Sequence, residues 1–331
     1  MMKKSLGYLK VFFKFSFAFF IIGYMVYSGR LDFAVVKKGF TQGATIFGAM
    51  SLLSLSACIA FYRWMLLSQG QGMAFSFSQA VRYGLIGCFF NTTMPGAVSG
   101  DIIKAWYVIA DHKGFQKTPV LTAIFLDRVM GVFGLVIVSS AALFFSWNSV
   151  WSSPQLHKIA IFVLLMAAGV FVFFCYMMIS MWGPFAYLRK KMEILQNYKV
   201  GRAFLKGYDA WMHYRNCPGI LLQALTLSVL THLSVVTTVI FCAHALEGAK
   251  VAFYQYFLLV PLGLLTTAIP VAPAGLGVGH VAFGQLFAAA GSTQGAEIFT
   301  LFVTFQIIIN LSGVFFYLKS DRVKVPQEAM E

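Results

Sequence analysis

Charged residues are scarce in this sequence, because Asp, Glu, Lys and Arg together make up only 11% of its 331 residues. Soluble globular proteins carry about 25% charged residues and about 45–50% apolar ones. Hydrophobic residues here reach 59%, and Phe alone occurs 35 times. A soluble fold has too little interior for so much apolar surface. The composition therefore excludes a soluble enzyme and a disordered chain, and it indicates a protein solvated by lipid.

Cysteine motifs and catalytic motifs are also lacking. The five cysteines form no Cys-x-x-Cys pair and no Cys/His spacing that suits zinc, so we interpret them as small buried packing residues. The sequence has no nucleophile motif and no phosphate-binding loop, and its stretches outside the apolar runs are too short for a substrate-processing domain. We therefore predict no catalytic residue, no metal and no cofactor.

Long apolar runs dominate what is present, and a transmembrane helix needs roughly 20 mostly apolar residues. Such runs predict spans near 11–29, 45–67, 119–147, 157–182, 219–245, 252–270 and 297–318, with a shorter run at 274–290. The expected fold is an all-α polytopic membrane protein with about eight transmembrane helices plus re-entrant or broken helices in two halves. We treat residues 1–331 as a single integral membrane domain.

The basic residues predict the orientation. Of the 25 Lys and Arg residues, 18 lie in segments 1–10, 63–118, 183–218 and 319–331, and five lie in the opposite loops. Because cytoplasmic loops carry the excess of basic residues, both termini are predicted to be cytoplasmic. The loop 183–218 mixes seven basic residues with aromatics. It suits either an ordinary cytoplasmic loop or a helix on an anionic leaflet, and no nucleic-acid module accompanies the charge.

The segment 79–110 looks wrong for a plain span. Its apolar stretch ends in the polar run that begins at Asn91, and Pro95 and Gly100 follow before a second amphipathic stretch. Proline removes a backbone donor and disfavours helix at the residue before it, whereas glycine permits close approach of helices. We interpret the segment as two half-helices that enter and leave on the same side.

A second break lies within 268–290, where Pro273, Gly275 and Gly277 precede His280. Unwound backbone at membrane depth is tolerated only where it is buried or lines a cavity. Interrupted segments in the two halves of a chain point to a transporter's binding site. We therefore expect these residues, with those of the first break, to surround a substrate cavity, although two unrelated kinks remain the alternative.

Ionisable residues within the spans need a reason, since each costs about 2.5–3.5 kcal/mol on insertion scales. Asp127 and Arg128 lie inside the 119–147 span, and Asp101 and Lys104 are spaced i,i+3 after the first break. Arg128 cannot lose its proton and needs an anion, which is Asp101, Asp127 or a lipid phosphate. Because Asp101 would repel a phosphate, we expect it to orient Arg128 or Lys104.

Other polar residues give weaker signals. Arg82 enters the first broken segment and is either a snorkelling residue or a headgroup ligand. Arg63 lies near a predicted span end, where we expect it to snorkel, and His232 is expected to take a hydrogen-bonded interior role.

Three motifs in order resemble one family. Segment 91–106 resembles the first signature of the lysylphosphatidylglycerol synthetase membrane-domain family, also called flippase-like proteins. Asp127 and Arg128 resemble that family's acidic-Arg pair, and segment 273–278 resembles its Pro-x-Gly-x-Gly segment. Lys104 stands where the family often has Arg, and His280 stands where an acidic residue is common.

The resemblance implies a multi-pass protein of the plasma (inner) membrane that moves lipids or lipid-linked groups between leaflets. Bifunctional members carry a cytoplasmic aminoacyl-transfer domain, which has no counterpart in this sequence, so we do not expect lysylphosphatidylglycerol synthesis. The substrate-binding residues that we predict are Arg128, Lys104, Asp101, Asp127, Arg82, Asn91, Pro95, Gly100, Pro273, Gly275, Gly277 and His280.

Three functions remain open at this point. The first is a flippase or translocase for an anionic membrane lipid or a polyprenyl-linked lipid. The second is a non-transporting accessory subunit of a lipid synthase or glycosyltransferase, docked through 183–218. The third is a membrane-embedded enzyme, for which Asp101 and His280 are the only acid/base pair. The lipid, the energy source and the oligomeric state, a homo-oligomer included, stay undetermined.

Overall fold

The computed structural model describes residues 41–94, 99–112, 114–152, 154–182, 212–247, 251–267 and 275–319, together with Lys37, Leu205, Tyr208 and Asp209. Every regular element in these ranges is a helix. The expected all-α membrane fold is therefore confirmed. The predicted span 11–29, most of the loop 183–218, and both Pro95 and Pro273 lie outside the described residues.

Five helices in the described ranges are long and apolar enough to cross a membrane. They are α3 (Gly43–Gly70), α6 (Lys117–Phe145), α8 (Pro154–Trp182), α11 (Pro218–Ala245), and the pair α14 (Gly295–Leu311) and α15 (Gly313–Lys319), which together form one span. A helix of 28 residues extends roughly 42 Å at ~1.5 Å per residue, which exceeds the hydrocarbon thickness of a bilayer. The chain is thus a multi-pass membrane protein.

Two shorter elements connect the long helices. The single-turn α7 (Trp147–Trp151) lies between α6 and α8, and the 3₁₀ helix η2 (His213–Asn216) leads into α11. The side chains of Trp147 and Trp151 contact each other with ring centroids 5.1 Å apart. Tryptophans at the end of an apolar span are typical of the membrane–water interface.

The first broken segment forms a helical hairpin of α4 (Phe77–Thr93) and α5 (Ser99–Asp111). α4 begins with a capping box, in which the Ser76 hydroxyl and the Gln79 side chain each accept a backbone N–H. Tyr83 near the start of α4 donates a hydrogen bond to Asp111 at the end of α5, over 2.8 Å. The two helices are therefore antiparallel, and each is too short to cross a bilayer unaided.

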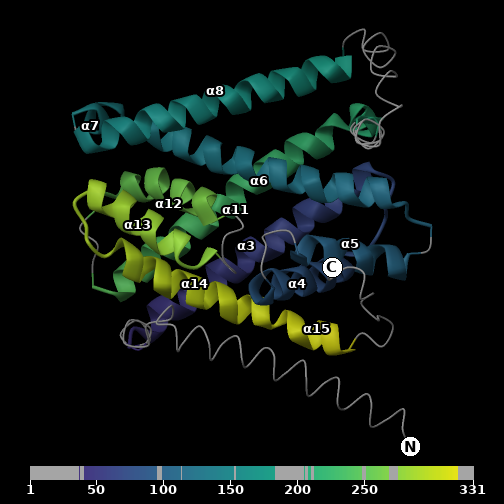
Figure 1. Ribbon diagram of the computed structural model, residues 1–331, viewed down its shortest axis with the longest axis horizontal. Coiled ribbons are helices and arrows are strands. Elements are labelled where there is room, and N and C mark those ends of the chain that lie inside the picture. Colours follow the sequence, from purple (N-terminus) through teal and green to yellow (C-terminus); the bar gives the residue numbers. More distant parts are fainter. Residues whose placement is uncertain are drawn as a thin grey trace, which may run out of the picture.

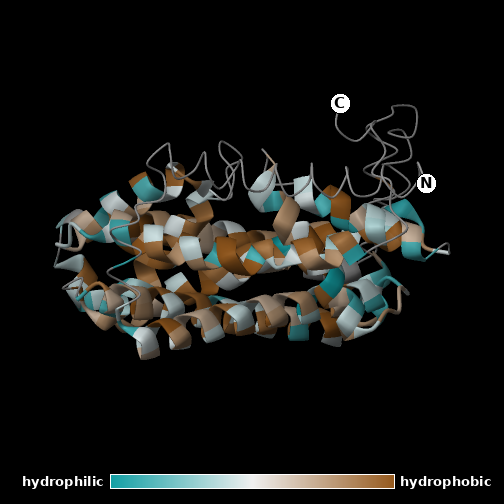
Figure 2. Ribbon diagram, turned by 90° about the horizontal axis from the view of Figure 1, so that it is seen from below, coloured by the Kyte–Doolittle hydropathy of each residue, from teal (hydrophilic) through white to brown (hydrophobic). Residues whose placement is uncertain are grey.

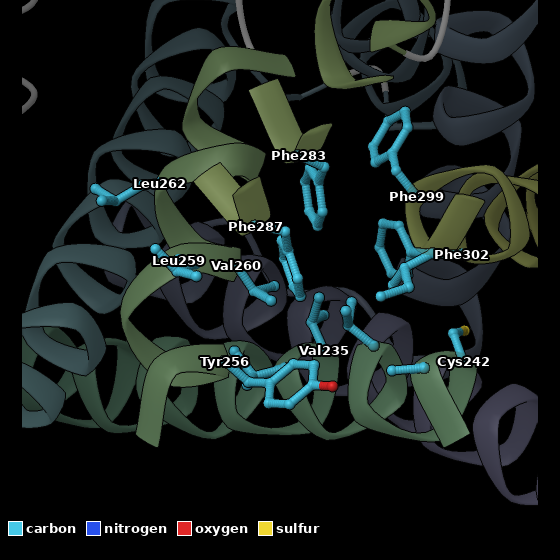
Figure 3. Close-up of a cluster of buried hydrophobic side chains, with 14 of the residues drawn as sticks. Val235, Cys242, Tyr256, Leu259, Val260, Leu262, Phe283, Phe287, Phe299 and Phe302 are labelled. Atoms are coloured by element: carbon cyan, nitrogen blue, oxygen red, sulfur yellow. The ribbon is translucent and has the colours of Figure 1, made fainter. Parts of the chain in front are cut away.

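A second hairpin is formed by α12 (Phe253–Thr267) and α13 (Val278–Ala289). A Cβ at Gly263 of α12 would collide with the Phe283 ring of α13, and the Tyr256 and Phe287 rings lie 5.6 Å apart. In Figure 3, Phe283 and Phe287 of α13 face Phe299 and Phe302 of α14. Aromatic packing therefore joins this hairpin to the last span.

The α14–α15 span connects the two hairpins. Its Thr300 bonds His280 near the start of α13, and its Asn310 donates to Thr92 near the end of α4. These contacts are ten residues apart, roughly 15 Å along a helix. In Figure 1 the hairpin α4–α5 lies at one end of the long axis and α12–α13 at the other, with α14 running between them. The ends of the hairpins nearest their breaks therefore face the middle of the bundle.

Large hydrophobic side chains cover much of the outside, as expected for a surface in contact with lipid. Figure 2 shows hydrophobic residues along the middle of the bundle and more hydrophilic residues toward its two ends. On α8, Phe171 is 68% exposed and Leu165 is 66% exposed. We expected the five cysteines to be buried, but Cys58 is exposed and only Cys242 is buried. The difference arises because lipid, and not water, is the outer solvent of these spans.

Candidate functional site

Arg128 and Asp101 form an ion pair between α6 and α5. The Arg128 Nε donates to Asp101 Oδ2 over 2.7 Å, and its Nη2 lies 2.6 Å from the same oxygen. Asp101 stands in the first turn of α5, where a carboxylate is favoured by the helix dipole. The Arg128 side chain is 45% exposed, so the carboxylate orients the guanidinium but does not cover it.

Asp127 pairs with Arg63 and not with its neighbour Arg128. The Arg63 Nε donates to Asp127 Oδ1 over 2.7 Å, and its Nη1 donates to the Ser228 hydroxyl of α11 over 2.8 Å. The expectation that Arg63 snorkels is wrong, because its side chain is only 7% exposed. α3 continues to Gly70, which places Arg63 two turns inside the helix and against α6 and α11.

Lys104 lies on the same helix as Asp101 but does not pair with it. Its Nζ stands 3.6 Å from the centroid of the Trp64 ring, and the residue is 7% exposed. A cation over the face of an indole is stabilised by the ring quadrupole, and more strongly where water is excluded. The ring supplies attraction without neutralising the ammonium.

These five charged residues form what we call the central charge cluster, made of Arg63, Asp101, Lys104, Asp127 and Arg128. Lys104 lies within electrostatic range of Arg63, Asp101 and Asp127, and all but Arg63 lie within such range of Cys88 on α4. Counted with every group in its usual charge state, three cations and two carboxylates give the cluster a formal net charge of +1. Residues from α3, α5 and α6 contribute to it.

Small residues let the first hairpin close over the cluster. A Cβ at Gly100 of α5 would collide with the Gly87 carbonyl of α4 and with Asn91, so only glycine fits there. The Asn91 Oδ1 accepts a hydrogen bond from the Gly100 N–H over 2.8 Å. That N–H belongs to the first turn of α5 and has no partner within its own helix. Asn91 and Gly100 thus fix the start of the helix that carries Asp101 and Lys104.

Arg82 lies at the other end of the hairpin. Its Nη1 is 3.6 Å from Asp111, the same carboxylate to which Tyr83 donates. Along α4, Arg82 is nine residues before Asn91, roughly 13 Å on a helix. The structure therefore does not bring Arg82 together with the central charge cluster.

The residues of the second break form a separate arrangement. Gly275 and Gly277 have φ angles of 69° and 84°, in the left-handed region that favours glycine. His280 accepts the Gly277 N–H at its Nδ1 over 3.3 Å, and its Nε2 lies 3.0 Å from the Thr300 hydroxyl. His280 caps α13 and ties it to α14, and none of its hydrogen-bond partners among the described residues belongs to the central charge cluster.

Sequence reasoning missed three members of this region. Arg63 was placed at a span end, and neither Trp64 nor Ser228 carried a motif that pointed to the site. The signal that pointed to Arg63 was Asp127 itself, because a carboxylate inside a span needs a cationic partner. The hydrogen-bonded interior role expected for His232 is confirmed, since its Nε2 lies 2.9 Å from the Gly131 carbonyl.

Within the described part of the chain, no group of three His, Cys, Asp or Glu side chains could hold a metal ion.

Comparisons with known proteins agree with this architecture. No curated protein and no solved structure matches the sequence. The family described as the lysylphosphatidylglycerol synthase TM region matches residues 11–314. This family is linked to lipid modification and translocation. No catalytic domain was identified. The chain therefore belongs to the lysylphosphatidylglycerol synthase transmembrane-region family.

Proposed function

We propose that the protein is a lipid translocase, which moves an anionic phospholipid or a lipid-linked headgroup between the two leaflets. The observation that carries the proposal is the Arg128 guanidinium, which is held by Asp101 on one side and is 45% exposed. Arginine binds phosphate with two N–H groups at once and keeps its charge in any environment. A phosphate reaching Arg128 would meet a cation that is already oriented.

The charge of the central cluster supports the same substrate class. Its formal net charge of +1 is complemented by a phosphate carrying one negative charge. A charge inside a bilayer costs about 2.5–3.5 kcal/mol on insertion scales unless it is compensated. Lys104 strengthens this preference, because its ammonium faces an indole ring and not a carboxylate.

The two hairpins supply a path for the headgroup. Their ends nearest the breaks face the middle of α14, and broken helices near the membrane midplane are where transporters bind their substrates. In this proposal the headgroup crosses beside Arg128 while the alkyl chains stay in the bilayer. The protein then needs no soluble catalytic domain.

The location and orientation are part of the proposal. The plasma membrane is the location that the family resemblance favours, and the distribution of Lys and Arg places both termini in the cytoplasm. On this orientation α6 begins at the cytoplasmic face with Lys117 and ends near the outer face with Phe145. Arg128 is then about 16 Å from the start of the helix, near the midplane.

Reconstitution tests the assignment. Purified protein is placed in liposomes that contain phosphatidylglycerol with a fluorescent headgroup, and transfer between leaflets is followed by quenching from one side. Arg128→Ala and Asp101→Ala are expected to slow transfer about 10- to 100-fold, the worth of one hydrogen bond to a charged group. Arg215→Ala is the matched control, since Arg215 is exposed before α11 and should leave the rate unchanged.

Two outcomes would contradict the proposal. Transfer at the unmodified rate in both cluster variants would show that the Arg128–Asp101 pair does not bind the headgroup. A wild-type protein that moves no lipid, and that copurifies with one stoichiometric partner, would instead favour a non-transporting accessory subunit.

A further inference from the structure

Lys104 is the member of the central charge cluster that has no counter-ion. Both carboxylates of the cluster are engaged by an arginine. Asp101 is held by Arg128. Asp127 is held by Arg63. Among the described residues, no carboxylate lies within ion-pair distance of the Lys104 Nζ, so the cluster consists of two closed ion pairs and one buried cation.

The first hairpin covers the Lys104 side chain closely. A Cβ built at Gly87 of α4 would lie 3.4 Å from the Lys104 Cβ and 3.6 Å from its Cδ. The charged and titratable side chains of this region come from four helices, namely Arg63 of α3, Cys88 of α4, Asp101 of α5, and Asp127 and Arg128 of α6. Loss of charge from either carboxylate would leave an arginine unpaired, so the proton on Lys104 is the one whose loss breaks no ion pair.

The proton on Lys104 therefore sets the formal charge of the cluster. The cluster is at +1 when Lys104 is an ammonium, and the two ion pairs leave it at zero when Lys104 is a neutral amine. A buried lysine gives up its proton readily, whereas an arginine keeps its proton. Because the bilayer interior penalises net charge, an empty site favours the amine. A site that holds a phosphate with one negative charge favours the ammonium, since the formal charges then cancel.

We infer that binding of an anionic headgroup at the central charge cluster draws one proton onto Lys104, and that release of the headgroup frees this proton. The lone pair of the Lys104 Nζ accepts the proton from bulk water, and no bond of the lipid forms or breaks. Binding and protonation are reciprocal, so each favours the other. The inference rests on the proposed function, and it names the proton as the ion to which lipid movement is coupled.

The affinity for an anionic lipid should fall as the pH rises. The proton taken up on binding is harder to obtain where protons are scarce, so uptake of one proton lowers the affinity by up to about tenfold for each pH unit. At low pH, where Lys104 is already charged in the empty site, binding draws no further proton and the affinity stops changing. The phosphate of the lipid keeps its charge throughout, so the titration belongs to the protein.

Isothermal titration calorimetry counts the protons. Purified full-length protein in a nonionic detergent is titrated with dihexanoyl-phosphatidylglycerol at a mildly alkaline pH, in two buffers that differ in their heat of ionisation. The difference between the two heats gives the protons taken up per lipid, and wild type is expected to take up about one. Glycerophosphoglycerol, which has the same phosphate diester without chains, should bind several-fold more weakly. Equal affinity for this soluble ester would overturn a lipid as the coupled substrate.

Two substitutions at Lys104 separate its proton from its packing. Lys104→Arg keeps the charge at every pH, so it should bind the lipid with no proton uptake and no pH dependence. Lys104→Met keeps the length of the side chain without the charge, so it should bind several-fold more weakly, again with no uptake. Lys117→Met is the matched control, because Lys117 is exposed at the start of α6, and it should take up the same proton as wild type.

The outcomes distinguish this inference from the proposed function. Proton uptake that persists in both Lys104 variants would overturn the inference, because another group then carries the proton. Binding to wild type without proton uptake would overturn it as well and leave the proposed function standing. A wild-type protein that binds no phosphatidylglycerol would overturn the inference together with the headgroup site, and the liposome measurement shows separately whether lipid moves.

Discussion

Gly100 of α5 lies so close to the Gly87 carbonyl of α4 that no Cβ fits between them. The backbones of the two helices are in direct contact at this point. Small residues allow the close approach of helices in membranes, where packing and not the hydrophobic effect holds helices together. The position of Asp101, one residue later, depends on this contact.

Gly100→Ala should destabilise the protein by about 1–3 kcal/mol, the usual cost of inserting a methyl group into a filled contact. The measurement is thermal unfolding in detergent, followed by intrinsic fluorescence. Gly169→Ala is the control, because a Cβ on that residue of α8 meets no atom within 4 Å. Alanine is the better helix former, so the control should be neutral or slightly more stable. Equal unfolding temperatures for the two variants would contradict the close contact.

Arg63→Met should be more harmful than its double variant with Asp127→Leu. Removing one partner of a buried ion pair costs about 3–5 kcal/mol, whereas replacing both with apolar residues is often neutral. The Arg63 and Asp127 side chains are 7% and 17% exposed and are joined over 2.7 Å. Thermal unfolding of wild type, both single variants and the double variant forms a complete cycle. A double variant as unstable as the sum of the singles would show that the pair does not interact.

Gly275→Ala should destabilise the second break more than Gly277→Ala. Both residues have positive φ, which costs a non-glycine residue about 1–2 kcal/mol. Only at Gly275 would the new Cβ also collide, with the side chain of Thr267, whereas Gly277 has open space around it. Unfolding temperatures of the two variants decide the order, and a larger loss in Gly277→Ala would be inconsistent with this geometry.

Tyr214→Phe should change the alkaline part of the stability profile. The Tyr214 hydroxyl donates to the Leu67 carbonyl over 2.6 Å, and its burial raises the pKa of the phenol above its ordinary value of about 10. A raised pKa in the folded state stabilises the fold at lower pH, and this contribution is lost as pH rises above 10.

Wild type should therefore lose stability more steeply than Tyr214→Phe as pH rises above about 10. At neutral pH the variant should be less stable by about 1 kcal/mol, because one buried hydrogen bond is missing. Unfolding temperatures measured across this range test both statements. Parallel profiles for the two proteins would show that Tyr214 does not titrate differently on folding.

The pattern of hydrophobic residues predicted the long helices well, because lipid-exposed spans must be continuous and apolar. The predicted spans 119–147 and 219–245 correspond to α6 and α11 within two residues at each end. The predicted span 297–318 is divided at Ser312, where α14 ends and α15 begins at Gly313. Such a local break leaves the hydrophobicity unchanged and so gave no signal.

The partners of the charged residues were harder to predict. Asp101 was expected to orient Arg128 or Lys104, and the structure shows the pair with Arg128. Arg63 was misplaced because its pairing depends on residues 64 and 165 positions away in the sequence, Asp127 and Ser228. Side-chain spacing on one helix carries no information about contacts with another helix.

The ion pair of Arg63 and Asp127 has a consequence for how the sequence can drift over evolutionary time. A mutation at either position alone leaves an uncompensated charge inside the apolar bundle, and selection would remove most such intermediates. Change at one position should therefore survive only when the other changes soon afterwards. Homologous proteins are expected to keep both charges or to lose both, and the two positions should vary as a unit while the surrounding leucines and phenylalanines are exchanged freely.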